Sequence, residues 1–494
     1  MAAPERFCAG SYLLLAVSAL GLTAPSAALA ATAAALTATS ATERPLSWRQ
    51  LSGAEAAQPA ETPPPAPAGE EAAAGGLVPH LKFGLEVKAN FRQSEDNRFA
   101  VPFPFTPDQL PVGQTRGFEE TVNPGSHLEV SNLTLLGDAR WGEAVKAHLK
   151  VDFINLYYRN PTSTDKKFEV SEVWLLFGRQ TLPAMSAKGS GLYVKAGKFP
   201  KFERQNDRHL ESYGLVSTAF NRFEDVGAEV GIDLGRNVYL KVSETAGNPV
   251  FLRDPNALAG DNGTPVLLQS HPNPTLHTGI DILYDTHVND YNLGHPQLGA
   301  GVGLRLGDET GRNGIDLLVW GRRRSLADKL ELEGTFYGGD LEIFNTPIPG
   351  HTSLPITNRR KQEAGGNLWL YLGDLSLFGQ FVDQKLAGLP RRGYEGELAY
   401  RFELPLALAV GGQQLFSFIA PAVRYSRLDN RFKNSLPTPA PSFAWNWYKL
   451  DGGLRVGVLA GIDLTLEYAD NTFTLGSGAK AHDNEFLTTL RWRV

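Results

Sequence analysis

The lysines and arginines of this chain are the residues whose side chains could most directly bind a ligand, namely an anion. Ammonium and guanidinium groups attract anions, and a confined passage with low-dielectric walls strengthens that attraction. The candidates are Lys201, Arg204, Arg208 and Arg222 in the stretch 199–224, Lys146 and Lys150 in the stretch 145–153, and Arg322 and Arg324 in a run of three arginines. Five acids lie in the stretch 199–224 or directly after it and can neutralise its bases: Glu203, Asp207, Glu211, Glu224 and Asp225.

Three basic runs lie at predicted strand ends, at 322–324, 359–361 and 391–392. One hypothesis makes them part of a funnel that attracts anions. The other makes them solvated loop charges, or partners for anionic lipopolysaccharide. Both hypotheses stay open from the sequence.

Patterns that would indicate catalysis are weak. The glycines of Gly299-Ala-Gly-Val-Gly303 fall on alternate positions of one strand face and no helix follows, which favours small side chains facing an interior over a dinucleotide loop. No pair of histidines has the spacing of a zinc protease, and there is no Gly-x-Ser-x-Gly sequence. Neighbouring carboxylates such as Glu395 and Glu397 are interpreted as strand charges that face water. We therefore predict no catalytic residue, no metal and no cofactor.

The elements that must position these charges are strands of alternating polarity. In residues 81–92, apolar residues from Leu81 to Phe91 alternate with polar residues from Lys82 to Arg92. Successive side chains of a strand point to opposite faces, so one face is apolar and the other polar. The same pattern returns at 145–153, 226–234, 276–282, 298–306, 394–402 and 462–468. Charges of both signs with glycines between them, strand after strand, indicate a water-filled interior rather than the outer face of a soluble sandwich.

The last nine residues repeat this pattern up to the carboxylate. Phe486, Leu490, Trp492 and Val494 lie two or four residues apart, with Arg491 and Arg493 between them. The last strand of a membrane barrel must close the sheet with lipid on one side and water on the other. This ending resembles the C-terminal assembly signal of Gram-negative outer-membrane proteins, although it finishes on Val494 where Phe is usual.

Composition supports the same class. The mean hydropathy is −0.21, and no run of 18 apolar residues follows residue 40, so membrane-spanning helices are not predicted. A closed barrel is then the remaining way to satisfy the backbone in a membrane. The net charge of −6 without a basic block does not favour nucleic-acid binding.

The N-terminal part is predicted to lie outside the barrel. Residues 1–30 combine a basic start, an apolar core and the small-residue pattern Ala28-Leu29-Ala30, which predicts a cleaved signal peptide. The single cysteine, Cys8, leaves with that signal, so the mature chain has no thiol. Residues 31–78 are rich in Ala and Pro and predict a disordered periplasmic arm. The barrel is predicted over residues 79–494.

The connections follow a pattern of tight turns at one end and long loops at the other. Tight turns are predicted at 141–143, 235–237, 373–374 and 459–461, and long loops near 93–126, 199–224, 247–275, 344–362 and 427–446. Tight turns would face the periplasm and long loops the exterior. The chain length suits 16 strands, with 18 as the alternative. Six tryptophans near strands or strand ends are interpreted as interfacial aromatics: Trp141, Trp174, Trp320, Trp369, Trp447 and Trp492.

One stretch resembles a known family. A strand ending in Gly197-Lys-Phe-Pro200, a polar loop, and then Arg222-Phe-Glu-Asp-Val-Gly227 leading into the next strand resemble the phosphate-selective porin O and P family and related porin-like proteins. The resemblance covers roughly residues 190–235. It implies a 16-stranded trimeric barrel whose pore uses cationic side chains to bind anions.

Together these observations predict an all-β, transmembrane antiparallel barrel that is integral to the outer membrane. The predicted function is passive diffusion of small hydrophilic solutes or ions, with a preference for anions such as phosphate as the finer prediction. The predicted partners are those solutes, outer-membrane lipid and lipopolysaccharide, the barrel-assembly machinery and two further copies in a homotrimer, without nucleic acid. A barrel enzyme and a secreted β-rich carbohydrate-binding protein are the alternatives.

Overall fold

A computed structural model describes residues 79–100, 118–120, 125–154, 168–205, 207–221, 224–248, 250–253, 266–267, 277–278, 282–285, 294–333, 338–340, 354–406, 408–435, 442–475 and 477–494. The predicted signal peptide and arm, residues 1–78, lie outside the described residues. Among the helices that the structure describes, none combines the length and the apolar character needed to cross a membrane.

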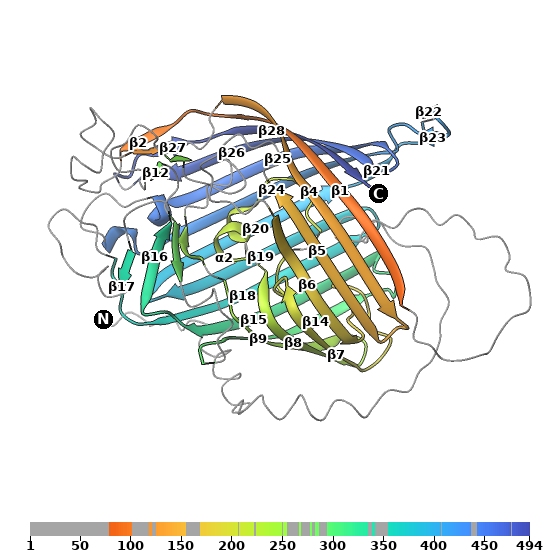
Figure 1. Cartoon of the computed structure of the whole chain (residues 1–494), viewed down its shortest axis with the longest axis horizontal. Helices are drawn as coiled ribbons and strands as arrows, with labels where there is room; N and C mark the ends of the chain where they lie inside the picture. The colour runs from red at the N-terminus through yellow and green to blue at the C-terminus, as the bar shows by residue number, and fades with distance from the viewer. Residues whose placement is uncertain are drawn as a thin grey trace, which may run out of the picture.

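The long strands form one closed antiparallel barrel (Figure 1). The sheet contains 18 strands, of which β21 (Phe402–Glu403) and β27 (Lys480–His482) are short additions at the ends of longer hairpins, leaving 16 in the wall. In chain order the wall consists of β1 (His80–Ser94), β4 (Gly125–Trp141), β5 (Val145–Ile154), β6 (Phe168–Gly178), β7 (Gly191–Phe199), β8 (Asp225–Leu234), β9 (Val238–Thr245), β14 (Gln297–Gly307), β15 (Asn313–Ser325), β18 (Arg360–Leu372), β19 (Leu375–Leu386), β20 (Leu389–Tyr400), β24 (Phe418–Asn430), β25 (Asn446–Leu459), β26 (Ile462–Thr474) and β28 (Glu485–Arg493). The prediction of 16 strands is confirmed. The wall is one closed sheet and not the two packed sheets of a soluble sandwich.

The two ends of the wall meet through β1 and β28. These strands pair antiparallel, from Glu86 opposite Arg493 to Ser94 opposite Glu485. The last residue continues the ladder, since the amide of Val494 donates to the carbonyl of Leu85 at 3.0 Å and the amide of Leu85 donates to the carbonyl of Val494 at 2.9 Å. The prediction that the C-terminal segment closes the sheet is confirmed.

Alternation along each strand separates an apolar outer face from a polar inner face. On β5, Leu149 is 42% exposed on the outside, whereas Lys146, His148 and Lys150 have the opposite parity and point inward. On β28, Phe486, Leu490 and Trp492 point outward and Arg491 inward. An apolar exterior on a closed sheet is the arrangement that hydrocarbon requires.

The connections at the two barrel ends differ in length. Short turns at 142–144, 235–237, 373–374 and 460–461 share one end with the C-terminus (Figure 1). The long connections share the other end, which is therefore the extracellular one. Each end has exceptions: 179–190 and 401–417 are long connections at the turn end, and Ala387–Gly388 is a tight turn at the loop end.

One predicted wall strand is wrong. The described residues of the stretch 276–282 belong to two short strands, β12 (His277–Thr278) and β13 (Ile282–Asp285), and neither joins the barrel. β13 pairs instead with β10 (Val250–Arg253) and β16 (Lys329–Glu333), which with β17 (Gly338–Asp340) form a separate four-stranded sheet from two long connections. Further short pairs are β2 (Arg98–Ala100) with β3 (Phe118–Glu120), β11 (Val266–Leu267) with β12, and β22 (Ala409–Val410) with β23 (Gln413–Gln414). Alternating polarity identifies a two-faced strand but not the sheet that it joins.

The interpretation of the tryptophans as interfacial residues is wrong for most of them. Trp320, Trp369 and Trp447 are 1–3% exposed and point into the barrel. Trp174 also points inward and stacks on His148, with ring centroids 5.1 Å apart. Trp492 does lie on the outer face, 43% exposed. Trp320, Trp369 and Trp447 pack where the lumen is filled by protein rather than water.

Inward glycines make room for this filling. A Cβ on Gly303 would lie 2.0 Å from the ring of Tyr239, and a Cβ on Gly231 would lie 2.1 Å from the ring of Tyr193. Both tyrosines are buried inside the barrel. The prediction that Gly299, Gly301 and Gly303 face the interior is confirmed.

Candidate functional site

The connection between β7 and β8 folds into the barrel. We call its described residues, 200–205 and 207–221, the inward segment. Near its start, Glu203 forms a two-pronged ion pair with Arg322 of β15, with Nε–Oε1 at 2.8 Å and Nη2–Oε2 at 2.7 Å. The carbonyl of Glu203 also accepts hydrogen bonds from Asn367 at 2.5 Å and Gln380 at 3.1 Å. This end of the segment is thus fixed to β15, β18 and β19.

The middle of the inward segment is held by buried charges of β20, β24, β25 and β26. The hydroxyl of Ser212 hydrogen bonds to Glu467 and accepts from Arg424 at 2.7 Å. Arg424 is 0% exposed and lies 2.8 Å from Asp451. Lys449 donates to the carbonyl of Tyr213 at 2.8 Å. Bonds between ionised partners are the strong ones in a low-dielectric interior.

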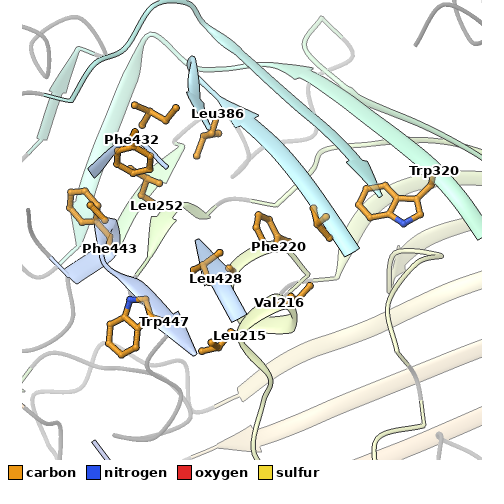
Figure 2. Close-up of a cluster of buried hydrophobic side chains, with 14 of the residues drawn as sticks. Leu215, Val216, Phe220, Leu252, Trp320, Leu386, Leu428, Phe432, Phe443 and Trp447 are labelled. Atoms are coloured by element: carbon orange, nitrogen blue, oxygen red, sulfur yellow. The ribbon is translucent and has the colours of Figure 1, made fainter. Parts of the chain in front are cut away.

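The end of the inward segment is the helix α2 (Leu215–Phe220), which packs on an apolar cluster. The side chains of Leu215, Val216 and Phe220 lie inside the barrel close to Leu428 and Trp447 (Figure 2). Glu395 of β20 accepts hydrogen bonds from the amides of Val216 at 3.0 Å and Ser217 at 3.5 Å, which are free donors at the start of the helix, and from the hydroxyl of Ser217 at 2.9 Å. The expectation of a uniformly water-filled interior is therefore wrong for this half of the barrel.

Glu211 ties the inward segment to the strands that close the barrel. Its carboxylate accepts from Lys88 of β1 at 3.0 Å, Arg455 of β25 at 3.1 Å and Arg491 of β28 at 3.2 Å. Burial by itself would raise the pKa of the Glu211 carboxyl, but the three cations outweigh burial and hold the pKa well below its usual range.

The inner wall on the other side of the barrel is not covered. Some of the inward side chains of β4, β5 and β6 remain partly exposed, among them Asp138 at 22%, Lys150 at 30% and Glu172 at 15% side-chain exposure. Others on the same strands, such as His148 and Asp152, are buried. Inward side chains of β18 to β26 are buried beneath the inward segment. Water therefore reaches the interior along β4–β6, and we call the space between this wall and the inward segment the aqueous passage.

Charges of both signs face each other across the aqueous passage. Lys150 on the wall interacts electrostatically with Glu172 beside it and with Tyr213 of the inward segment. It also interacts with Glu224, which follows the inward segment in the chain. Arg204 forms an ion pair with Glu224, with Nη1–Oε1 at 2.5 Å. A solute that crosses here meets hydrogen-bonding and ionic groups on both sides. Among the described residues, no three His, Cys, Asp or Glu side chains gather as metal ligands.

The predicted site residues divide between the packed half and the passage. In the packed half, Lys201 is buried and donates to the carbonyl of Phe220 at 3.1 Å, and Arg324 pairs with Asp285 at 2.5 Å. Arg322 belongs there too, bound to Glu203. Lys146 and Lys150 point inward from β5 and are partly exposed, and so are Arg204 and Arg208 of the inward segment. Arg208 stacks on Tyr213, 3.9 Å from the ring centroid. Arg222 lies outside the described residues.

Sequence reasoning missed the residues that anchor the inward segment. Glu395 and Glu397 were interpreted as charges facing water, but they are 4% and 2% exposed and bind the segment. Arg424, Lys449 and Asp451 were not singled out, although their inward parity on neighbouring strands is visible in the sequence. What the sequence lacks is the partner, because the segment reaches these strands from some 180 to 250 residues away.

One hydrogen-bonded chain has the order of a nucleophile, base and acid. Ser376 Oγ lies 3.2 Å from His209 Nε2, and His209 Nδ1 lies 2.8 Å from Glu397 Oε1. All three side chains are buried, with only 2–4% of each exposed. Glu397 is shared with Arg424 at 3.5 Å. A catalytic triad needs a nucleophile that substrate can reach, with oxyanion donors beside it. Because Ser376 is buried, this series of hydrogen bonds serves to anchor the inward segment.

No protein-family model matches the chain, and no curated protein is similar to it in sequence. Among solved structures, the chain is similar to the outer membrane channel DcaP of Acinetobacter baumannii, with 11% identity, 84% of this chain and 97% of that chain covered and a TM-score of 0.45. It is similar to Pseudomonas putida OprB, with 10% identity, 84% and 94% covered and a TM-score of 0.44. The anion-selective porin from Comamonas acidovorans is 10% identical, with 84% and 100% covered and a TM-score of 0.39.

The membrane location follows from the wall of this chain itself. Its sheet closes without a free edge, its outer face is largely apolar, and most charged side chains of the wall point inward. Antiparallel barrels of this construction span the outer membrane. The chain is thus an integral β-barrel of the outer membrane.

Proposed function

We propose that the chain is a porin that lets small hydrophilic solutes diffuse passively across the outer membrane. The observation that carries this proposal is the division of the lumen. The inward segment fills one half, and half-exposed polar side chains of β4–β6 line the other. A narrow, polar and ionic passage favours hydrated solutes over apolar ones. No chemical step belongs to this function.

We further propose that the passage prefers anions such as phosphate. The bases that carry this preference are Lys146, Lys150, Arg204 and Arg208, because they lie along the passage. Lys201, Arg322 and Arg324 are bound to partners in the packed half. They affect solutes only through the summed electrostatic potential of the wall. Glu172 and Glu224 oppose the preference and keep it moderate.

The assembly proposed with this function is a homotrimer inserted by the barrel-assembly machinery. The strand that this machinery would recognise is β28, whose outward residues Phe486, Leu490 and Trp492 are exposed to lipid. The resemblance in residues 190–235 to trimeric porin-like proteins supports the trimer.

Planar-bilayer recordings under a salt gradient test both proposals. The wild type should form stable conducting pores with a reversal potential that favours chloride over potassium. The variant K146E/K150E should move this potential toward cations, most clearly at low salt, where screening is weak. The control K385E makes the same kind of charge change on the outer face of β19 and should leave the potential unchanged. Absence of conductance from folded protein would contradict the porin. Conductance with an unmoved potential would contradict only the anion preference.

A further inference from the structure

The basic runs of the sequence are divided by the two faces of the wall. Arg322 and Arg324, Lys361, and Arg391 point inward and are buried. Their neighbours Arg323, Arg360 and Arg392 have the opposite parity and point outward. Lys385 of β19 also lies exposed on the outer face. Each run therefore contributes one base to the exterior of the barrel near its extracellular end.

Three of these outer bases lie together. Across the sheet, Arg323 of β15 is opposite Gln362 of β18, and Gln362 is opposite Lys385 of β19. With strands about 5 Å apart, the Cα atoms of Arg323 and Lys385 are separated by roughly 10 Å. Arg360 stands two residues along β18 from Gln362, about 7 Å away on the same face. Their long side chains can converge on one anionic group. We call Arg323, Arg360 and Lys385 the outer basic triangle.

No acid that the structure describes neutralises the triangle. Among the residues that the structure describes, none places a carboxylate within 4 Å of the charged group of Arg323, Arg360 or Lys385. The neighbouring outer bases do have such partners, with Arg392 3.3 Å from Asp383 and Arg427 2.9 Å from Asp429. Positive charge is thus concentrated at one place on the outer wall.

The triangle continues into the lipid-facing surface. Beside it, toward the middle of the membrane, lie Val319 at 45%, Phe381 at 37% and Tyr394 at 37% exposure. Cationic groups above an apolar and aromatic surface complement a molecule with an anionic head and acyl chains. A free anion would use only the first of these features. The extracellular position corresponds to the outer leaflet, whose glycolipid, lipopolysaccharide, carries phosphate groups on its membrane-embedded sugars.

We propose that the outer basic triangle is a binding site for the phosphorylated headgroup of one lipopolysaccharide molecule, with its acyl chains lying along β15, β18 and β19. This site is independent of solute passage through the lumen. Two of its three bases, Arg323 and Arg360, are the outward members of basic runs whose inward members are buried in the interior.

Binding of fluorescent deep-rough lipopolysaccharide to the purified barrel in neutral detergent tests the proposal. The variant R323Q/R360Q/K385Q should bind about a hundredfold more weakly, since each base near an anionic membrane surface strengthens binding roughly fivefold. The matched control removes three exposed bases at the turn end, R179Q/R236Q/R312Q, and should bind like the wild type. Retained migration of the folded form on unheated gels shows that the variants are intact barrels.

Three results would overturn the proposal. Equal binding by both triple variants would place the glycolipid elsewhere on the wall. Equal affinity of the wild type for phosphatidylglycerol would make the triangle a general anionic-lipid contact. Displacement of the probe by millimolar inorganic phosphate alone would make the triangle a site for a free anion.

Discussion

Neighbouring residues of one strand meet opposite surroundings in this barrel. Leu149 is 42% exposed on the outer face of β5, where hydrocarbon surrounds it. Lys150 is on the inner face, 3.4 Å from Asp152 and in contact with the aqueous passage. A charge therefore costs stability at position 149 but not at the adjacent position 150.

Leu149→Arg should destabilise the barrel by about 2–4 kcal/mol, because a cation is then placed in the hydrocarbon region. Lys150→Ala should fold normally and change only conductance, because its site is already in water. Urea unfolding in lipid vesicles measures the first effect and bilayer recording the second. Equal tolerance of both changes would contradict the assignment of the two faces.

Glu211 is the second residue with a decisive role, since one carboxylate balances three cations. Glu211→Gln should destabilise the folded barrel by about 3 kcal/mol, because Lys88, Arg455 and Arg491 then lose their common counter-charge. Loss of this tie should also loosen the inward segment and increase conductance noise. Glu309→Gln, on an exposed turn, serves as the control and should change neither quantity.

The ionisation of Glu211 also sets a pH range. Its folded-state pKa is lowered, so its contribution to stability is present above the unfolded pKa of about 4.3 and is lost only as the pH falls through the folded value. Wild-type conductance noise should therefore stay constant between pH 7 and pH 5. A rise in noise over that range, absent in Glu211→Gln, would show that Glu211 becomes protonated there.

At the scale of elements, β28 and the inward segment do different work. β28 closes the sheet between β26 and β1 and carries its apolar side chains outward. The inward segment crosses the lumen and joins strands on opposite sides of the barrel, from β15 to β1. One element removes the free edge, and the other determines how much of the lumen is open.

Replacing Trp492 and Val494 by Asp should prevent stable assembly. Both charges would face lipid on the closing strand, and an open edge leaves backbone groups unpaired at several kcal/mol each. Cell fractionation should find the double variant unassembled in the periplasm or degraded. Replacement of Thr488 by Ala, a small change on the same strand, is the control. Wild-type amounts of the Asp variant in the outer membrane would contradict the role of β28.

At the scale of the whole molecule, the barrel is one cooperative sheet. A closed sheet unfolds only by breaking a complete row of strand pairings, so detergent at room temperature leaves it folded. Unheated samples should migrate differently from boiled samples on gels. Chemical cross-linking in membranes should yield a product of three copies. A heat shift without that product would support the barrel and contradict the trimer.

The sequence by itself determined the local pattern and the class of the protein. The alternation in 81–92, 145–153 and 462–468 became β1, β5 and β26, because burial on a two-faced sheet depends on the parity of each residue. The closing role of the C-terminal segment was also predictable, since its outward and inward faces are fixed by neighbouring residues. The placement of the tight turns followed in the same way.

Only the tertiary structure decided what fills the interior. The partners of Glu397, Arg424 and Glu467 come from residues about 190 to 255 positions away, and no local pattern encodes that contact. The tertiary structure also gave two adjacent arginines different surroundings. Arg322 is in a buried ion pair with Glu203, and Arg323 points to the outer face of the wall. The tertiary structure further placed His277–Thr278 and Ile282–Asp285 outside the wall, because the choice of a partner strand depends on long-range pairing. Periodicity fixes which way a side chain points, and packing fixes what it meets.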